Sequence, residues 1–403
     1  MIDTSTASTI DVPDAPAIPG LVFRRFRDRS DFAHIADIAN RAGLADGNTD
    51  IRTPEAMEEQ YAHLTNSDLH HDLLLVDVDQ VTIGYGRVEW WDETAGNRIY
   101  SLFGHIVPEW RRQGIGTAML RCNEARIREI ASTNATDLPC FLQSYAGDTA
   151  IGAETLLKQT GYIATRHGFD MERDLSEPIG STALPVGIEV RSPTPEHYRQ
   201  IWDADVEAFR DHWGFREPSE TDYAGWLAWP NLAPHLWQVA WEGDEIVGMV
   251  LNFINPEENA TLNRERGYTE GISVRRPWRK KGVASALINR SLLMFREMGM
   301  TEAALGVDAE NLSGALRVYE RCGFNVVKRG TTYRKSMNLE KEEGGNKGYS
   351  GVVVANTAPR AGLVPARGAH CAPQNSPNPL RLAIKAHKSF AVEVFWLHRC
   401  VKH

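Results

Sequence analysis

The chain has little cysteine, and its cysteines form no metal-binding or redox pair. Five are spread over 403 residues: Cys122, Cys140, Cys322, Cys371 and Cys400. No two are spaced as CxxC, and the histidines, including His70 and His71, show no metal-ligand spacing. An odd, sparse set argues against a disulfide framework or a zinc site and indicates a reducing compartment. We therefore expect no bound metal ion.

The sequence also lacks the segments that target or anchor a protein. Residues 1–19 have neither the basic start nor the apolar run of a signal peptide. No apolar stretch is long enough to span a bilayer. The formal net charge is -9, which argues against nucleic-acid binding by overall charge. We expect a cytoplasmic protein that binds neither membrane nor nucleic acid, and its acidity mildly favours an amine-bearing partner.

What is present is an internal duplication. The length suits two domains of roughly 150 residues each. The sequence divides into five parts: a disordered leader at 1–19, a first domain at 20–176, a linker at 177–186, a second domain at 187–339, and a tail at 340–403 that is disordered or carries no selected structure.

Both domains show the same order of elements. Each opens with a short strand (Leu21–Arg25 and Gly187–Arg191) and a helical region. Two strands joined by an acidic turn follow, then a fourth strand, a glycine-containing turn, a helix, a buried strand, another helix and two terminal strands. Placing Gly161 on Gly323 also brings Gly168 onto Gly330. This order predicts an α/β (α+β) fold in each domain, a mixed sheet with helices on both faces.

The glycine-containing turns are suited to binding a pyrophosphate. The residues in the first domain are Arg111, Arg112, Gln113, Gly114, Ile115, Gly116 and Thr117, and those in the second are Arg279, Lys280, Lys281, Gly282, Val283, Ala284 and Ser285. Backbone N–H groups at a helix start bind anions, and small residues let a phosphate approach. The basic side chains add positive charge. A plain strand–turn–helix connection is the alternative. A dinucleotide fingerprint fits worse because neither turn supplies its third glycine, and no Walker lysine pattern is present.

These turns match the pattern Arg/Gln-x-x-Gly-x-Gly/Ala, and the chain therefore resembles the GCN5-related N-acetyltransferase (GNAT) family. The tandem arrangement, over about residues 20–340, is similar to that of the mycothiol synthases. The resemblance implies two GNAT-like acyl-CoA N-acyltransferase domains, with acetyl-CoA as co-substrate. It further implies transfer of an acetyl group to a primary amine of a small molecule.

The resemblance also assigns roles in the second domain. Asn311 reads as a helix N-cap, and by resemblance it contacts the pantetheine arm, while Tyr319 protonates the departing thiolate. Glu270, on the strand before the turn, is the candidate general base. The backbone of Ile272, Ser273 and Val274 would pair with the pantetheine amides, and an N–H there would stabilise the oxyanion. The alternatives are a core aromatic for Tyr319 and a salt-bridged glutamate for Glu270.

The first domain departs from this pattern at each chemical position. Thr149 stands where Asn311 would be, Leu157 where Tyr319 would be, and Leu102 where Glu270 would be. A leucine cannot donate a proton, so we predict a non-catalytic first domain that is structural or holds acyl-CoA. Rescue by Tyr145 or His105 is the alternative.

The segment between the first helix and second strand of the second domain would shape the acceptor pocket. It is rich in aromatic and acidic residues: Asp205, Phe209, Asp211, His212, Trp213, Phe215, Glu217, Tyr223, Trp226 and Trp229. Aromatic rings with carboxylates can hold an ammonium, although most of these rings would serve the core. The competing reading for the whole chain is a non-catalytic acyl-CoA-binding or sensing module. The identity of the amine, the acyl length and the oligomeric state do not follow from the sequence.

Overall fold

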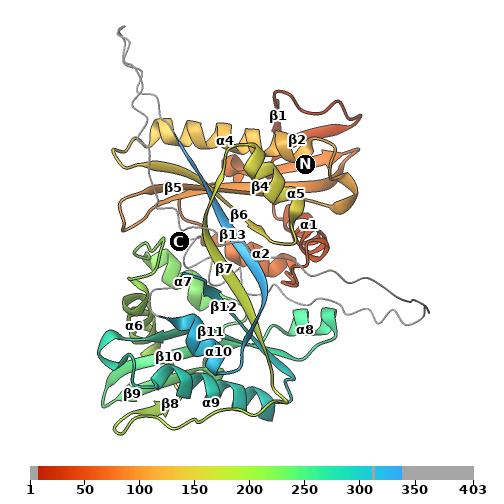
Figure 1. Ribbon diagram of the computed structural model, residues 1–403. Helices are drawn as coiled ribbons and strands as arrows, with labels where there is room; N and C mark the ends of the chain where they lie inside the picture. Colours follow the sequence, from red (N-terminus) through yellow and green to blue (C-terminus); the bar gives the residue numbers. More distant parts are fainter. Residues whose placement is uncertain (1–7, 311–313, 338–403) are drawn as a thin grey trace, which may run out of the picture. The chain divides into compact units, whose positions relative to one another are not determined.

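The two halves of the chain fold into lobes built on the same plan (Figure 1). The structure is a computed structural model and describes residues 8–310 and 314–337. Within that range the strands form one sheet in the order β1-β2-β3-β4-β5-β6-β13-β7-β12-β11-β10-β9-β8. The described residues belong to one compact unit.

The first lobe contains β1 to α5, together with β13. Its elements are β1 (Thr9–Ile10), β2 (Leu21–Arg25), α1 (Asp31–Ala45), α2 (Pro54–Ala62), α3 (Leu69–Asp72), β3 (Leu73–Val78), β4 (Val81–Asp92), β5 (Arg98–Ile106), α4 (Ile115–Thr133), β6 (Cys140–Gly147) and α5 (Ile151–Gln159). The strands from β1 to β5 are antiparallel, and β6 runs parallel to β5.

The second lobe repeats this plan from β8 to α10 and includes β7. Its elements are β8 (Glu189–Arg191), α6 (Tyr198–Phe209), α7 (Glu220–Ala228), β9 (Gln238–Glu242), β10 (Glu245–Phe253), α8 (Pro256–Leu262), β11 (Arg266–Val274), α9 (Val283–Glu297), β12 (Glu302–Asp308) and α10 (Ala315–Arg321). Again the early strands are antiparallel, and β12 is parallel to β11.

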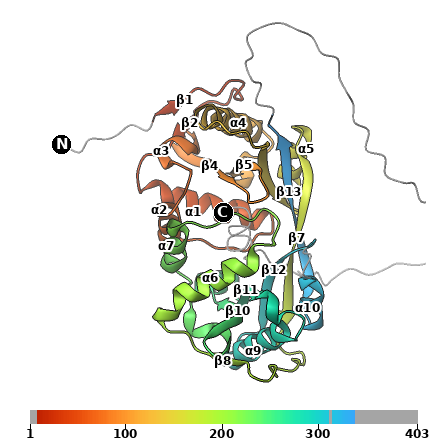
Figure 2. The same ribbon diagram turned by 90° about the vertical axis from the view of Figure 1, so that its left-hand side faces the viewer.

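The last strand of each lobe is exchanged. The strand β7 (Ile163–Asp174) leaves the first lobe and pairs with β12, while β13 (Asn325–Ser336) pairs with β6, and the two also pair with each other. They run side by side through the middle of Figure 1 and along the right-hand side of the ribbon in Figure 2. The expectation of two terminal strands in each domain was therefore wrong. Gly168 and Gly330 do not make turns but face each other in register, and a Cβ at Gly330 would collide with the Tyr145 ring.

Helices cover both faces of the sheet, as the sequence predicted. Figure 2 shows α4 and α1 on opposite sides of β4 and β5. In the second lobe α9 and α6 both pack on β10 and β11. Each lobe has its own apolar core, with Leu287 and Phe295 of α9 fully buried in the second. Burial of such side chains contributes about 1.5–3 kcal/mol each.

The expected leader is structured in its described part. Thr9 and Ile10 pair with Arg24 and Phe23 of β2, and Val12 is buried in the first lobe's core. In the linker, Ile179 and Leu184 pack against the core of the second lobe. The expected tail at 340–403 lies outside the described residues. Across the described part of the chain, no helix is both long and apolar enough to cross a bilayer.

Candidate active site

The two glycine turns have the same backbone conformation. Arg112 and Lys280 both have φ of 63°, and Gly114 and Gly282 follow with φ of 86° and 87°. Each glycine is the N-cap of the long helix that starts at the next residue, α4 or α9. Glycine adopts such positive φ values at no steric cost, and the first N–H groups of each helix are left free to meet an anion. The conformation thus supports the predicted pyrophosphate site in both lobes.

The first arginine of each turn hydrogen-bonds to the end of the preceding strand and to a helix that is distant in the sequence. Arg111 Nε donates to Ile106 O at 3.0 Å, and Arg279 Nε donates to Val274 O at 2.9 Å. Their Nη2 atoms both donate to carbonyls at the end of the first long helix, Ala42 O and Ala208 O, each at 3.1 Å. These guanidinium groups therefore fix the turn to the strand and the helix.

The remaining turn residues differ in exposure. Those before the helix are exposed, namely Arg112, Gln113, Gly114, Lys280, Lys281 and Gly282. Ile115 and Val283 are buried and anchor the helix starts in the cores, while Gly116, Thr117, Ala284 and Ser285 are half-buried beside them. The exposed lysines stand where the turn meets solvent, so their charge is available to an incoming phosphate.

Glu270 lies buried at the point where β11 and β12 diverge. The two strands pair only from Arg266 to Tyr268. Beyond that pair, Glu270 Oε1 accepts a hydrogen bond from the Gly306 amide at 3.1 Å. Its other oxygen is buried with no hydrogen-bond partner among the described residues. Burial raises the pKa of Glu270 well above its usual value, the Gly306 hydrogen bond opposes this, and the charge of Asp170 adds to it.

Tyr319 lies on α10. It is buried in the core of the second lobe with Cys322 and Phe324. Burial raises the pKa of its phenol, and the charges of Glu270 and Cys322 raise it further. The two predicted acid–base residues therefore lie within electrostatic reach of each other. Asn311, the predicted pantetheine contact, lies outside the described residues.

A bulge in β11 shapes the edge that would meet the pantetheine arm. Met249 pairs with Ser273 but Leu251 pairs with Glu270, so Gly271 and Ile272 oppose a single residue of β10. Gly271 has φ of 53°, and a Cβ there would lie 2.9 Å from Leu251 carbons. Ser273 is buried, while Ile272 and Val274 are half-buried. The bulge turns the residues after Glu270 and so sets the direction of their backbone groups.

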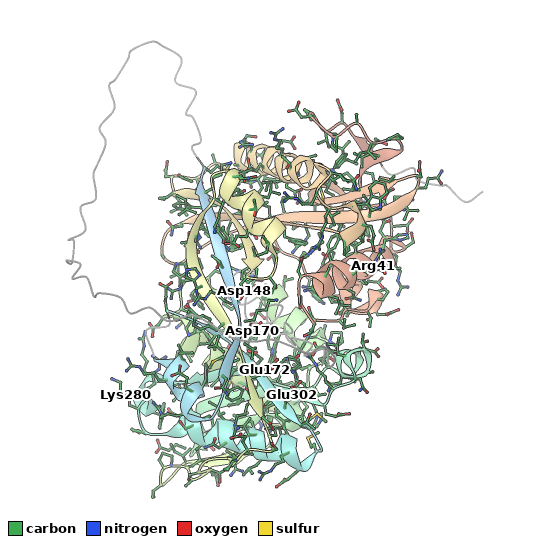
Figure 3. All side chains as sticks on the ribbon, turned by 45° about the vertical axis from the view of Figure 1, so that its right-hand side comes forward. Arg41, Asp148, Asp170, Glu172, Lys280 and Glu302 are labelled. Atoms are coloured by element: carbon green, nitrogen blue, oxygen red, sulfur yellow. The ribbon has the colours of Figure 1, made fainter. Side chains whose placement is uncertain are left out.

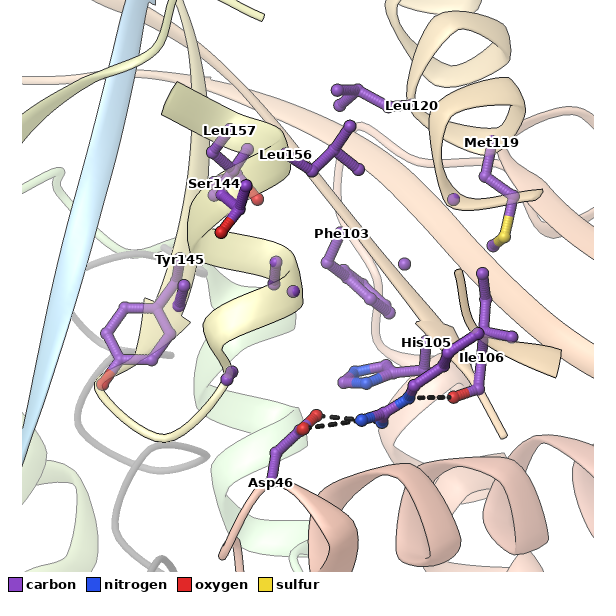
Figure 4. Close-up of a pocket in the computed structure, with 18 of the residues that line it drawn as sticks. Asp46, Phe103, His105, Ile106, Met119, Leu120, Ser144, Tyr145, Leu156 and Leu157 are labelled. Carbon is purple, nitrogen blue, oxygen red and sulfur yellow. Dashed lines mark hydrogen bonds and ion pairs between the residues drawn. The ribbon is translucent and has the colours of Figure 1, made fainter. Parts of the chain in front are cut away.

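The first lobe holds a cavity of about 460 Å³ beside its own turn (Figure 4). Its walls include Gly114 and Gly116 of the turn, His105, Tyr145 and Leu157. Burial lowers the pKa of His105 to about 4, and the nearby charges of Arg52 and Arg111 add to the shift. The imidazole is therefore neutral at physiological pH. Thr149 donates its hydroxyl to Asp46 O and is committed to that contact.

The residue that corresponds to Glu270 in the first lobe is Leu102, because the parallel ladders of the two lobes start at Arg98 and Arg266 and these two residues lie four positions further on. The ladder between β4 and β5 runs without a bulge, whereas β11 is bulged just after Glu270. Leu102 packs with Leu120 of α4 in the core, while Phe103 lies over Arg87, with 5.7 Å from the guanidinium carbon to the ring centroid. Neither Leu102 nor its neighbour Phe103 can accept a proton, so the first lobe lacks a base at this position.

Most of the aromatic residues on the predicted acceptor side serve packing. Trp226 stacks on Trp237 with centroids 5.4 Å apart, and Trp229 packs edge-on to Phe253. Trp213 lies over the Arg334 guanidinium, 4.2 Å from its carbon. The carboxylates are also engaged: Asp211 binds Arg276 and Arg279, and Glu217 binds Arg210. This segment therefore offers few groups for an acceptor ammonium. In the described ranges, no cluster of His, Cys, Asp and Glu could hold a metal ion.

The sequence analysis missed two charged residues at this site, Asp170 and Lys328. Both lie on exchanged strands, where they are register partners. Asp170 lies on the central strands between the labelled Asp148 and Glu172 (Figure 3). Lys328 also lines the cavity of the first lobe. Nothing in the local sequence indicates that a first-half carboxyl reaches the second lobe, because the exchange is a property of the whole sheet.

Comparison with known proteins agrees with the motifs. Residues 198–324 match the acetyltransferase (GNAT) family. A mycothiol acetyltransferase from Salinispora arenicola is 27% identical over 335 residues, which are 77% of this chain and 95% of that protein. A GCN5-related N-acetyltransferase from Sphaerobacter thermophilus superposes with a TM-score of 0.59 at 27% identity, over 81% of this chain and 97% of the other. A tandem GNAT protein from the clavulanic acid biosynthesis pathway gives a TM-score of 0.57 at 16% identity, over 78% and 98% of the two chains, and shares the fold.

Proposed function

Since the chain belongs to the acetyltransferase (GNAT) family and is an acyltransferase, we propose that it moves an acetyl group from acetyl-CoA to a primary amine of a small molecule. We further propose that the second lobe performs the transfer. The observation that carries this assignment is that Glu270 is buried where β11 and β12 diverge and lies within electrostatic reach of the buried Tyr319 phenol. The first lobe has Leu102 and Leu157 at the corresponding places.

The geometry supports a direct transfer. Glu270, with a raised pKa, accepts a proton from the acceptor ammonium, which frees the amine to attack the thioester carbonyl. The carbon–sulfur bond then breaks and Tyr319 donates its proton to the departing thiolate, so that the products are an amide and a free thiol. Burial keeps Tyr319 protonated until the thiolate forms. The N-terminal end of α9 and the exposed Lys280 and Lys281 would hold the pyrophosphate.

For the first lobe we propose binding of acyl-CoA without transfer. Its turn has the same backbone angles as that of the second lobe, and the cavity beside the turn lies between Gly116 and Leu157. No group in a position equivalent to Glu270 or Tyr319 can exchange a proton. The competing interpretation, a non-catalytic acyl-CoA-binding or sensing module, therefore applies to the first lobe alone.

The test is release of free thiol from acetyl-CoA over a panel of small amines, including amino sugars and amino acids. Release that depends on the amine and yields its N-acetyl product supports the proposal and names the acceptor class. Tight binding of CoA without release on any amine contradicts transfer to a small-molecule amine. Binding studies with Gly114→Trp and Gly282→Trp variants then assign the bound CoA to the first or second lobe.

A further inference from the structure

Asp170 reaches the acid–base site from the other half of the chain. It lies on β7, whose residue-by-residue partner on β12 at this point is Gly306. Gly306 is also the residue whose amide binds Glu270. The side chains of Asp170 and Glu270 therefore flank Gly306 from the two neighbouring strands, β7 and β11. Paired strands are about 4.8 Å apart, and β11 has begun to diverge from β12 at Glu270, so the backbones of β7 and β11 are separated here by about 10 Å or more. The two carboxyl side chains extend into this space from both sides.

Nothing from β12 stands between the two carboxyl groups. Tyr268 pairs with Ala304, and side chains alternate along a strand, so Glu270 lies on the same face as Gly306 and its partner Asp170. The residue between them is a glycine and has no side chain. Asp170 Oδ2 and Glu270 Oε2 are both buried without a hydrogen-bond partner among the described residues. Asp170 is 5% exposed and Glu270 1%.

The charges around Asp170 come from every strand beside it. Burial raises the pKa of Asp170 to about 8, and the charges of Glu172 on its own strand and Asp148 after β6 raise it too. Lys328 on β13 and Arg266 on β11 act in the opposite direction. Arg266 is already held by Glu172 and Glu302. Lys328 is the register partner of Asp170 and is therefore the cation placed to set its charge.

We propose that Asp170 is a positioning residue for acetyl transfer, which shares a single negative charge with Glu270 at neutral pH while Lys328 stabilises that charge. Two buried carboxyl groups this close do not both ionise. The ionised carboxylate of the pair accepts the proton of the acceptor ammonium. The protonated carboxyl group of the pair keeps the site from carrying two negative charges. This inference rests on the proposed role of Glu270. It also means that the second lobe's base is completed by strands from both halves of the chain.

The first test does not depend on turnover. Infrared difference spectroscopy detects the C=O stretch of a buried protonated carboxyl group. At pH 7 we expect one such band in the wild-type protein, and its loss in both Asp170→Asn and Glu270→Gln, because the remaining acid then ionises. A band that persists in Asp170→Asn would show that Glu270 is protonated by burial alone and would overturn the inference. Loss of the band in these variants, together with no acetyl transfer by the wild-type protein on any amine, would leave the shared charge standing and contradict the proposed function.

The second test is the pH dependence of kcat/KM. Asp170→Asn removes a like charge, so the acidic limb moves to lower pH by about one unit. Lys328→Met removes the stabilising cation, so the limb moves to higher pH. Asp174→Asn, an exposed position on the same strand, is the matched control and leaves the limb in place. A lower kcat with an unmoved limb in both Asp170→Asn and Lys328→Met would indicate a merely structural role and overturn the proposal.

Discussion

Burial raises the pKa of the Tyr319 phenol on α10, and the negative charge of Glu270, on β11, raises it further. A nearby carboxylate disfavours a second negative charge, so an ionised base helps a neighbouring acid to stay protonated. The carboxylate keeps the phenol in its neutral form until a thiolate appears to take the proton. This relationship exists only in the second lobe, because Leu157 occupies the place of Tyr319 in the first.

Tyr319→Phe should lower kcat about 100-fold, within the range for loss of a general acid, with little change in the KM for acetyl-CoA. The ring remains to fill the buried space, so the melting temperature should change little. The measurement is steady-state thiol release with the best acceptor. Tyr145→Phe is the matched control in the first lobe and should retain wild-type activity. Equal losses in both variants would mean that the first lobe takes part in transfer.

Glu270→Gln should lower kcat/KM by about 10²–10⁴-fold and abolish the acidic limb of its pH profile. In the wild-type enzyme that limb should lie above the ordinary glutamate pKa of 4.5, because burial raises the pKa of Glu270 in the folded protein. The rate should fall as the pH drops through the raised pKa. A profile that is flat from pH 8 to pH 5 would contradict the assignment of Glu270 as the base.

The same variant should stabilise the fold at neutral pH. The unfolded chain releases the Glu270 proton near the ordinary glutamate pKa, while the folded protein keeps it to higher pH. Stability is therefore lost as the pH rises between these two values. Thermal unfolding at pH 4 and at pH 8 should show Glu270→Gln close to wild type at the lower pH and more stable at the higher. Equal stability of Glu270→Gln and wild type at both pH values would mean that burial does not destabilise the ionised form of Glu270.

Features that depend on residues close together in the sequence could be predicted, and features that depend on residues far apart in the sequence could not. The turns were predictable because a few adjacent residues determine a helix start, and Gly114 and Gly282 adopt the required φ. Glu270 and Tyr319 could be predicted as candidates because the motifs that point to them lie within one half of the chain. The hydrogen bonds made by Arg111 and Arg279 were not predicted, since each arginine joins a strand end to a helix that is distant in the sequence.

Non-local features escaped the sequence analysis. Two terminal strands were expected in each domain, yet Gly168 and Gly330 each lie inside one 12-residue strand. That misreading hid the exchange and with it the position of Asp170. The bulge at Gly271 was not foreseen either, since it depends on how β11 pairs with β10.

Gly282→Ala should raise the KM for acetyl-CoA in the transfer reaction about tenfold. There is room for the methyl group, because nothing lies within 4 Å of a Cβ at this position. The backbone, however, has φ of 87°, and a left-handed conformation costs a non-glycine residue about 1–2 kcal/mol. Relief of that strain would turn the N–H groups away from the pyrophosphate.

Gly114→Ala imposes the same strain on the first lobe and serves as the control. Its Cβ would meet Pro16 at 3.5 Å, an ordinary contact, so both variants should lose similar stability. Only Gly282→Ala should change the transfer kinetics. If Gly114→Ala raised the KM equally, the first turn would have to bind the reacting acetyl-CoA.

Cutting the connection between the lobes should not separate them. A protease site inserted between Val186 and Gly187 would be accessible, because Val186 is fully exposed. After cleavage the fragments should co-elute in size-exclusion chromatography and separate only in denaturant, with thiol release retained. Each fragment carries one strand of the other's lobe, and the ladders of β7 with β12 and of β13 with β6 contain seven register partners each. Independent domains would part once the linker is cut, and elution of two separate species without denaturant would contradict the exchange of β7 and β13.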